Sequence, residues 1–386
     1  MPEPVNLEVV FLSDLHLGAH SPSESVIYTR AFATFLDHMR DVASTENRDC
    51  RLVLLGDSLD FLKVGARTAE GRSRLETSTE AAIEKLEEIA RQEPLFFVAV
   101  GRFAAAGLAV DVVPGNHDID LVRPAVQDHF RRLVERASEC TGAGDRITFQ
   151  PWIYHVPGVV YAEHGHQHHD INSFATLLRP YARGDEECLD LPLAASFESS
   201  GKARTGASVL RHAVKLLHPD RRERRREYRE KVLRPYAAHV GLDPATVEAI
   251  DELAEVSIGS MAARLLSKSF VHRARGGRPT QRGGYLHRAT VAIHRVLASS
   301  QASAPYYVFG HTHIAERFPV LTGASPPEYL NTGTWSPRLP GGLAPRDGSP
   351  LLTFVRIQAD TGLSPRGEVL VWDDTSHRSR PLDVCT

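Results

Sequence analysis

The sequence is poor in cysteine and lacks a long uninterrupted hydrophobic run. Only four of its 386 residues are cysteine, and none form a CxxC pair, so a disulfide framework is excluded and we expect a reducing compartment. A membrane helix needs roughly 20 apolar residues, but the stretch 95–113 is interrupted by glycine and charged residues. We predict a buried helix followed by a buried strand there, and no transmembrane segment. Because the N-terminus lacks the basic region of a secretory signal, we expect a cytoplasmic protein.

Extreme net charge is also missing, which excludes a disordered chain. The net charge is -3 and 42% of the residues are hydrophobic, as in ordinary globular proteins. The charge is unevenly distributed, however. Residues 171–300 carry 22 Lys and Arg against 14 Asp and Glu, a net charge of +8, while the rest of the chain is at -11. We therefore predict a core domain formed by residues 1–170 and 301–386, and a basic insertion, 171–300, with distinct surface chemistry.

The insertion is mostly helical in pattern, over residues 203–217, 221–240, 244–270 and 286–299. Its most basic run is RRERRREYREKVLR, residues 221–234. This run fits a patch that binds phosphate or nucleic acid. The interpretation that we favour is a solvated helix with Glu–Arg pairs, because Glu223, Glu227 and Glu230 are interspersed among the arginines.

Short apolar runs in the predicted core end in polar tips, most of them containing glycine. These runs are 7–13, 51–55, 108–113, 159–162 and 306–309. Helical patterns at 26–40, 81–91 and 122–137 lie between the first of them, the order expected of a layered α/β fold. Residues 328–330, 351–357 and 368–372 are rich in β-formers. We predict that this C-terminal section completes a second sheet.

Each tip carries Asp, Asn or His. Asp14 and His16 follow the first run, and the sequences GDSLD (56–60), GNHD (115–118), HGH (164–166) and GHTH (310–313) follow the other four. Carboxylate, amide and imidazole groups are ligands of hard to borderline cations. Five such strand ends therefore predict a site for two divalent cations.

The ordered series DLH, GDSLD, GNHD, HG and GHTH resembles the calcineurin-like metallophosphoesterases, with motifs spanning residues 14–313. The resemblance implies a four-layer αββα sandwich with a helical insertion, residues 171–300, that forms a cap or lid. It also implies two bound divalent cations, Mn expected first, with Fe, Zn and Co as alternatives. Asp14, His16 and His313 match the ligands of one cation, Asn116, His164 and His311 match those of the other, and Asp57 matches the bridging carboxylate.

The resemblance also implies two catalytic residues. His117 matches the residue that contacts the substrate phosphate and protonates the leaving group, and Asp118 would orient it. Asp60 is interpreted either as a carboxylate supporting the site or as a loop cap. His166, His168 and His169 follow the matched His164. Contact with the substrate is one interpretation of them, but we favour solvent-facing or supporting roles. Residues 331–333 are expected to border the pocket.

The implied activity is hydrolysis of a phosphoester by a metal-bridging hydroxide with His117 as proton donor. The basic insertion favours a phosphodiester or small phosphoanhydride, because its arginines would add phosphate contacts beyond the scissile group. Protein phosphatases of the superfamily carry Arg and Glu where this chain has Phe61 and Asp118, so we expect a phosphorylated small-molecule substrate. A nuclease of the DNA repair type, with nucleic acid as partner, is one alternative, although a pI near 6.7 disfavours it. A non-catalytic metal-binding scaffold is the other, disfavoured because His117 and all matched ligands are present.

Overall fold

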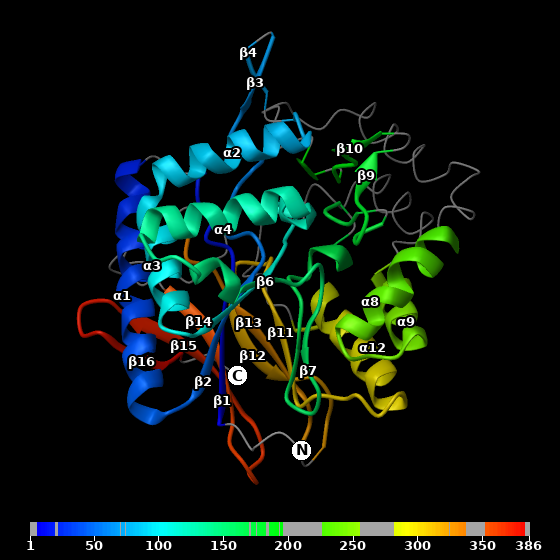
Figure 1. Cartoon of the computed structure of the whole chain (residues 1–386). Coiled ribbons are helices and arrows are strands. Elements are labelled where there is room, and N and C mark those ends of the chain that lie inside the picture. Colours follow the sequence, from blue (N-terminus) through cyan, green and yellow to red (C-terminus); the bar gives the residue numbers. More distant parts are fainter. Residues whose placement is uncertain are drawn as a thin grey trace, which may run out of the picture. The chain divides into compact units, whose positions relative to one another are not determined.

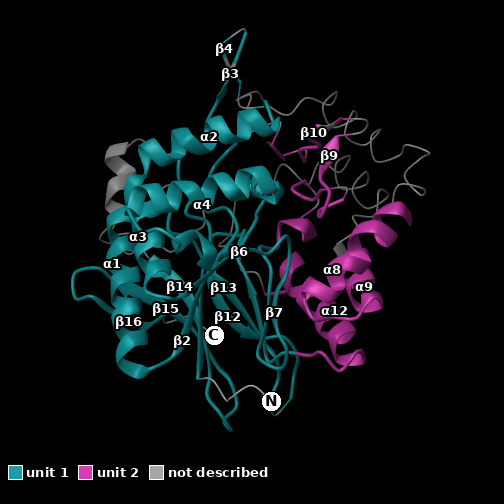
Figure 2. Ribbon diagram, in the orientation of Figure 1, with its two compact units in different colours: residues 1–164, 304–386 teal, residues 165–303 magenta. Residues whose placement is uncertain are grey.

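The computed structural model describes residues 6–19, 22–69, 71–73, 75–169, 171–174, 176–182, 185–192, 194–195, 226–254, 282–323, 325–336 and 352–382. It divides into two compact units, which Figure 2 shows in different colours. Unit 1 comprises residues 1–164 and 304–386, and unit 2 comprises residues 165–303. The predicted insertion, 171–300, falls inside unit 2. None of the described helices is both long enough and apolar enough to span a bilayer.

Unit 1 contains a seven-stranded sheet in the order β16-β15-β14-β1-β2-β5-β6 (Figure 1). The parallel strands are β1 (Leu7–Leu12), β2 (Asp49–Leu55), β5 (Ala109–Val113) and β6 (Ile147–Phe149). Successive side chains of a strand point to opposite faces. Val10 and Leu12 accordingly enter one core cluster and Val9 and Phe11 enter another. Burial on both faces explains the continuous apolar run by which β1 was predicted.

Four helices share a core cluster with one face of this sheet. They are α1 (Pro22–Glu46), α2 (Thr79–Gln92), α3 (Pro94–Ala105) and α4 (Pro124–Ser138). The 3-10 helices η1 (Ile119–Val122) and η2 (Ala143–Arg146) flank α4. Helix α2 begins after Ser78, whose side chain accepts a hydrogen bond from the Ala81 N–H, as an N-cap does. Helix α3 followed by β5 confirms the prediction of a buried helix and strand over 95–113.

A five-stranded sheet of unit 1 has the order β12-β13-β11-β8-β7. Its strands are β7 (Tyr154–Val156), β8 (Val160–Ala162), β11 (Tyr306–Phe309), β12 (Ala315–Pro319) and β13 (Glu328–Thr332). A second core cluster joins the two sheets, with Phe11 and Val53 from one and Val308 and Leu330 from the other. The predicted α/β sandwich is confirmed. Within its described residues, unit 1 forms three of the four predicted layers: one layer of helices and two sheets.

The C-terminal strands depart from the prediction that this section completes the second sheet. β12 and β13 do so, but β14 (Leu352–Ala359), β15 (Arg366–Asp373) and β16 (Arg378–Pro381) extend the first sheet. β14 pairs antiparallel with β1, with Phe11 opposite Val355. The prediction was therefore wrong for residues 351–357 and 368–372, because a run of β-formers identifies a strand but not its partner. A small hairpin of β3 (Ala66–Thr68) and β4 (Gly71–Ser73) was not predicted from the sequence.

Unit 2 contains the 3-10 helix η3 (His166–His168), a hairpin of β9 (Tyr181–Ala182) and β10 (Asp185–Leu189), the π-helix η4 (Arg229–Leu233), α8 (Arg234–His239), α9 (Pro244–Ala254) and α12 (Tyr285–Ser299). Its buried side chains include Leu233, Val247, Ile250, Ile293 and Leu297. Helix α12 confirms the pattern predicted over 286–299. The predicted helix 203–217 lies outside the described residues, as do the ends 221–225 and 255–270 of two others.

Candidate metal centre

The loops that follow the parallel strands of unit 1 are joined by their backbones. The Asp14 N–H donates to the Gly56 carbonyl at 3.1 Å, and the His16 N–H donates to the Asp57 carbonyl at 2.9 Å. The loop after β5 is tied in by a 3.1 Å bond from the Phe61 N–H to the His117 carbonyl. Parallel strands present their carboxyl ends at one edge of a sheet, where ligand sites form. The loop sequences DLH, GDSLD and GNHD therefore lie together.

Five of the matched ligand residues have left-handed backbone conformations. The φ angles are 55° at Asp14, 50° at His16, 51° at Asp57, 67° at His311 and 60° at His313. Residues other than glycine rarely adopt positive φ, and such outliers cluster at functional sites, where the surroundings hold them in place. The backbone strain of these loops therefore lies at the residues that were matched as ligands in the sequence.

Three motif glycines make room for neighbouring site residues. A Cβ atom at Gly56 would lie 2.4 Å from the His164 ring, and one at Gly115 would lie 2.1 Å from Asp57 Oδ1. At Gly310 a Cβ atom would lie 2.8 Å from Asp14 Oδ2. Non-bonded atoms do not approach so closely, so these positions accept no side chain without displacing a site residue.

We expect Gly115→Ala to lower both stability and metal uptake, because its φ is not positive and a Cβ atom there would meet the side chain and the backbone nitrogen of Asp57. Overpacking of this kind typically costs about 1–3 kcal/mol. Thermal unfolding of the metal-free protein and the number of bound Mn²⁺ ions would measure the two effects. Gly158→Ala is the control for metal uptake, since a Cβ atom there meets nothing within 4 Å. Its φ of +72° predicts a loss of stability from backbone strain, without a loss of bound Mn²⁺. Equal loss of bound Mn²⁺ in the two variants would contradict the steric argument.

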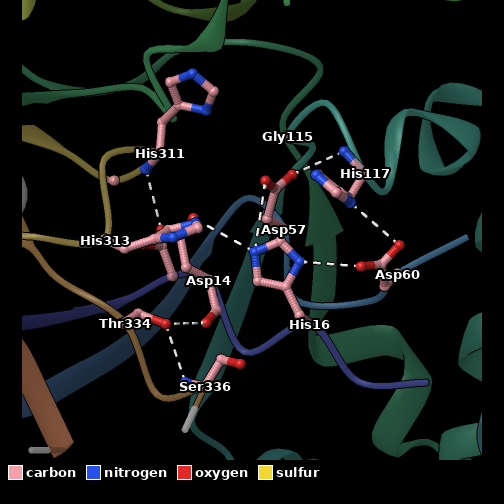
Figure 3. Close-up of polar contacts among 12 residues, drawn as sticks. Asp14, His16, Asp57, Asp60, Gly115, His117, His311, His313, Thr334 and Ser336 are labelled. Carbon is pink, nitrogen blue, oxygen red and sulfur yellow. Dashed lines mark hydrogen bonds and ion pairs between the residues drawn. The ribbon is translucent and has the colours of Figure 1, made fainter. Parts of the chain in front are cut away.

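One cluster of the site is formed by Asp14, His16 and His313 (Figure 3). Asp14 Oδ1 lies 3.1 Å from His313 Nε2 and 3.8 Å from His16 Nε2. Asp14 and His16 are buried, and the His313 side chain is 18% exposed. With metal–ligand bonds of about 2.0–2.2 Å, neighbouring ligand atoms are about 3–4 Å apart. The observed separations therefore fit a shared cation.

A second cluster is formed by Asp57, His164 and His311. Asp57 Oδ2 lies 3.2 Å from His164 Nε2 and 3.9 Å from His16 Nε2, so a single carboxylate oxygen faces histidines of both clusters. Its other oxygen accepts a 2.8 Å hydrogen bond from the His117 N–H. The Asp57 carboxylate therefore contacts histidines of both clusters.

The donor atoms of the two clusters are suited to cations. His16 Nδ1 lies 3.2 Å from Asp60 Oδ2, and His164 Nδ1 lies 2.8 Å from the Leu55 carbonyl. An Nδ1–H that donates to an acceptor leaves Nε2 with a lone pair, as in metal-binding histidines. His16 Nε2 is buried without a hydrogen-bond partner, and so is Asn116 Oδ1 in the loop between Gly115 and His117. The residues present therefore fit divalent cations held by oxygen and imidazole nitrogen.

Asp60 lies between His16 and His117, as Figure 3 shows. Its Oδ2 is 3.2 Å from His16 Nδ1, and its Oδ1 is 3.1 Å from His117 Nδ1. One buried carboxylate therefore supports a matched metal ligand and the matched proton donor together. Of the two interpretations of Asp60, the contacts favour a carboxylate supporting the site, although Oδ1 also accepts from the Lys63 N–H and so caps the loop.

Asp118, expected to orient His117, has its carboxylate among backbone N–H groups. Oδ1 accepts from Gly115 at 2.6 Å and from Asp57 at 3.1 Å, and Oδ2 accepts from Ser58 at 2.8 Å. Burial, and then the charge of Asp57, raise the pKa of Asp118 to about 6. Asp118 thus joins the GNHD loop to the GDSLD loop. The carboxylate that lies at His117 Nδ1 is that of Asp60.

The buried histidines and aspartates shift one another's pKa values. Burial alone would lower the pKa of His117, but the charges of Asp60 and Asp57 raise it to about 9. Burial likewise opposes the charged form of His164, yet Asp57 and Asp14 raise its pKa to about 9. For Asp57, burial raises the pKa, but His164 and His117 outweigh this and hold it well below its usual range. Without metal, the site is therefore a set of imidazolium and carboxylate charges that compensate one another.

The histidines that follow His164 belong to unit 2. His166 is buried and packs against Phe174, with ring centroids 5.6 Å apart. His169 stacks on Tyr285 at 5.0 Å, and its Nδ1 lies 3.0 Å from Asn172 Nδ2. His169 and His168 are partly exposed. These positions are those of side chains packed within unit 2.

The described part of the basic run favours the interpretation as a solvated helix. Lys231 pairs with Glu227 at 2.7 Å and Arg234 pairs with Glu248 at 3.1 Å. Arg229 forms an ion pair with Glu252. These basic side chains are partly or well exposed and already have acidic partners. Residues 221–225, which include Arg222 and Arg225, lie outside the described residues.

No protein-family model matches the sequence, and no curated protein matches it. Among solved structures, the chain is similar to a 5'-nucleotidase from Candida albicans, with a TM-score of 0.34 and 12% identity over 97% of this chain and 52% of the nucleotidase. It thus spans about half the length of that protein. A phosphopantetheinyl hydrolase from Mycobacterium tuberculosis has a TM-score of 0.25 and 12% identity, over 86% of this chain and 91% of the hydrolase. At such TM-scores neither similarity defines a function, and the functional evidence lies in the site itself.

Proposed function

We propose that this protein is a metallophosphoesterase of the calcineurin-like type, which hydrolyses a phosphoester at a centre of two divalent cations. The observation that carries the proposal is Asp57, whose Oδ2 faces His16 of one cluster and His164 of the other. Asp14, His16, Asp57 and His313 would hold one cation, and Asp57, Asn116, His164 and His311 the other. Mn²⁺ is the ion proposed first, with Fe, Zn and Co as alternatives.

When bound, two such cations lower the pKa of water and stabilise the charge that develops on the phosphoryl oxygens. The chain's own contribution is the proton that a departing alkoxide needs. Asp60 lies at Nδ1 of His117, which leaves Nε2 as the nitrogen that would exchange the proton. In the metal-free protein the charge of Asp60 also favours the protonated form of the ring, the form in which a general acid must start.

The proposed substrate is a phosphorylated small molecule. Phosphodiesters and small phosphoanhydrides were favoured because of the basic insertion. The described basic residues Arg229, Lys231 and Arg234 are engaged with glutamates. This pairing argues against a nucleic acid partner for these residues. It also means that they do not distinguish a diester from a monoester substrate, so an assay must decide between the two.

Metal-stripped protein reloaded with Mn²⁺, Zn²⁺, Fe²⁺ or Mg²⁺ would be assayed with bis-p-nitrophenyl phosphate and p-nitrophenyl phosphate. We expect metal-dependent turnover, with the diester the better substrate. Turnover of the monoester alone would redirect the substrate class to phosphate monoesters. Absence of turnover on both, with two ions bound, would indicate either a specific substrate admitted by the insertion or the scaffold alternative. Failure to bind divalent ions at all would overturn the proposal.

Metal binding should release protons and strengthen as the pH rises. In the metal-free protein the pKa of His164 is about 9, so its ring is protonated at pH 7, with Nε2 directed at Asp57. A cation needs the Nε2 lone pair and must displace that proton. Below pH 9 we expect the affinity for the cation to fall about tenfold for every unit by which the pH is lowered, for each proton displaced. Calorimetry at pH 7 in buffers of different ionisation enthalpy would count the protons, and an affinity independent of pH would contradict this prediction.

A further inference from the structure

We propose that Ser13 and Thr332 form a hydroxyl relay that positions the Asp14 carboxylate for its cation. Ser13 follows the last residue of β1, and Thr332 is the last residue of β13. Both are buried, each with 1% exposure. The role assigned to them rests on the proposed function, because it concerns a carboxylate that would hold one of the two cations.

The two oxygens of Asp14 have different surroundings. Oδ2 accepts a hydrogen bond from Ser13 Oγ and another, 3.0 Å long, from the His311 N–H. Oδ1 accepts from neither group and instead faces His313 Nε2 at 3.1 Å. With protein donors on Oδ2, the carboxylate is fixed so that Oδ1 points into the cluster. This arrangement selects a single oxygen for the cation.

The direction of the relay follows from counting hydrogens. A carboxylate only accepts, so Ser13 uses its one hydrogen on Asp14. Ser13 Oγ also lies 2.6 Å from Thr332 Oγ1, and the hydrogen between these two oxygens must therefore come from Thr332. The other acceptor near Thr332 Oγ1, the Phe309 carbonyl, is farther away at 3.3 Å. The order is Thr332 to Ser13 to Asp14, and bonds that end on a charged acceptor are stronger than neutral ones.

The surroundings leave the relay little freedom. A Cβ atom at Gly310 would lie 2.3 Å from Ser13 Oγ, so glycine lets the loop after β11 close over this hydroxyl. The main chain of Asp14 is held as well, because Thr334 Oγ1 donates to the Asp14 carbonyl at 2.7 Å (Figure 3). Ser13 comes from the seven-stranded sheet and Thr332 from the five-stranded sheet. The relay therefore joins the two sheets of unit 1 directly behind a ligand.

The test is Mn²⁺ binding to the metal-free protein, measured by calorimetry and analysed for two sites. Ser13→Ala removes the donor to Asp14, and we expect one site to weaken about 10- to 100-fold, as for other residues that support metal ligands. The second site should keep its affinity. Thr332→Val removes the donor to Ser13 and should weaken the same site less. Thr332→Ser retains the hydroxyl and should restore wild-type binding.

Thr353→Val is the matched control, because Thr353 Oγ1 is buried nearby but donates to the Thr332 carbonyl at 2.6 Å and not to the carboxylate. It should bind Mn²⁺ as the wild type does. The unfolding temperature of each metal-free variant monitors folding. Wild-type affinity of both sites in Ser13→Ala would overturn the relay and leave the proposed function intact, because the wild type still binds two ions. Equal weakening by Thr353→Val and Ser13→Ala would also overturn it, since general disturbance of the strand ends would then explain both. A wild type that binds no Mn²⁺ would overturn relay and function together.

Discussion

Replacing His117 by alanine should lower kcat by about 10²- to 10⁴-fold, the usual contribution of a general acid. The loss should be larger for an alkyl phosphoester than for a p-nitrophenyl ester, because p-nitrophenolate leaves without much help from a proton. Binding of two Mn²⁺ ions should persist, since His117 is not among the matched ligands. Steady-state kinetics on both kinds of ester, with metal content measured in parallel, would test these expectations.

His129→Ala is the control for this substitution. His129 lies on α4 and its Nε2 is hydrogen-bonded to Glu87 Oε1 at 2.7 Å, so its removal deletes a histidine and a hydrogen bond without altering the site. It should leave kcat unchanged. A His117→Ala enzyme that loses the same factor with both esters would argue against proton donation and for a role in binding the phosphate.

Asp57→Asn should have the larger effect on the metal centre, because it removes the carboxylate that faces both clusters. The amide oxygen can still accept the hydrogen bond of the His117 N–H. The amide nitrogen would then be directed at His16 and His164, where it carries no lone pair for a cation. We expect fewer than two bound Mn²⁺ ions and a loss of activity on the order of 10³-fold or more, since the cations contribute several kcal/mol.

Asp111→Asn is a matched control for the same change of charge. Asp111 is a buried aspartate of β5 that accepts a 2.9 Å hydrogen bond from Gln150 Nε2 and belongs to neither cluster. This variant should keep two ions and its activity. If Asp57→Asn also kept both ions at wild-type affinity, the assignment of Asp57 as the bridging ligand would be wrong.

The sequence was most informative where physical requirements are local. The strands before Asp14 and Asp57 were predicted because burial on both faces produces an uninterrupted apolar run. The clustering of their polar ends followed from parallel strands meeting at one edge. Asp14, His16, Asp57 and Asn116 follow strands of the seven-stranded sheet, whereas His164, His311 and His313 follow β8 and β11 of the five-stranded sheet. The structure places the Asp and His members in the two clusters. Their roles remain part of the proposal.

The sequence does not show which side chains of different loops contact one another, or which strands pair. The spacing in GDSLD does not reveal that Asp60 contacts both His16 and His117, because that depends on how two loops fold against each other. Ser13 is a common residue before a turn, and only the packing of β13 brings Thr332 to it. The sheet to which β14 belongs is likewise decided by the open edge of β1 and not by the pattern of its own residues.

The left-handed conformations in the ligand loops have a consequence for protein engineering. At Asp14, His16, Asp57, His311 and His313 the backbone adopts a form that costs most residues about 1–2 kcal/mol and glycine almost nothing. A design procedure that optimises stability alone would therefore favour glycine at these five positions. The more stable chain would have lost side chains that form the two clusters.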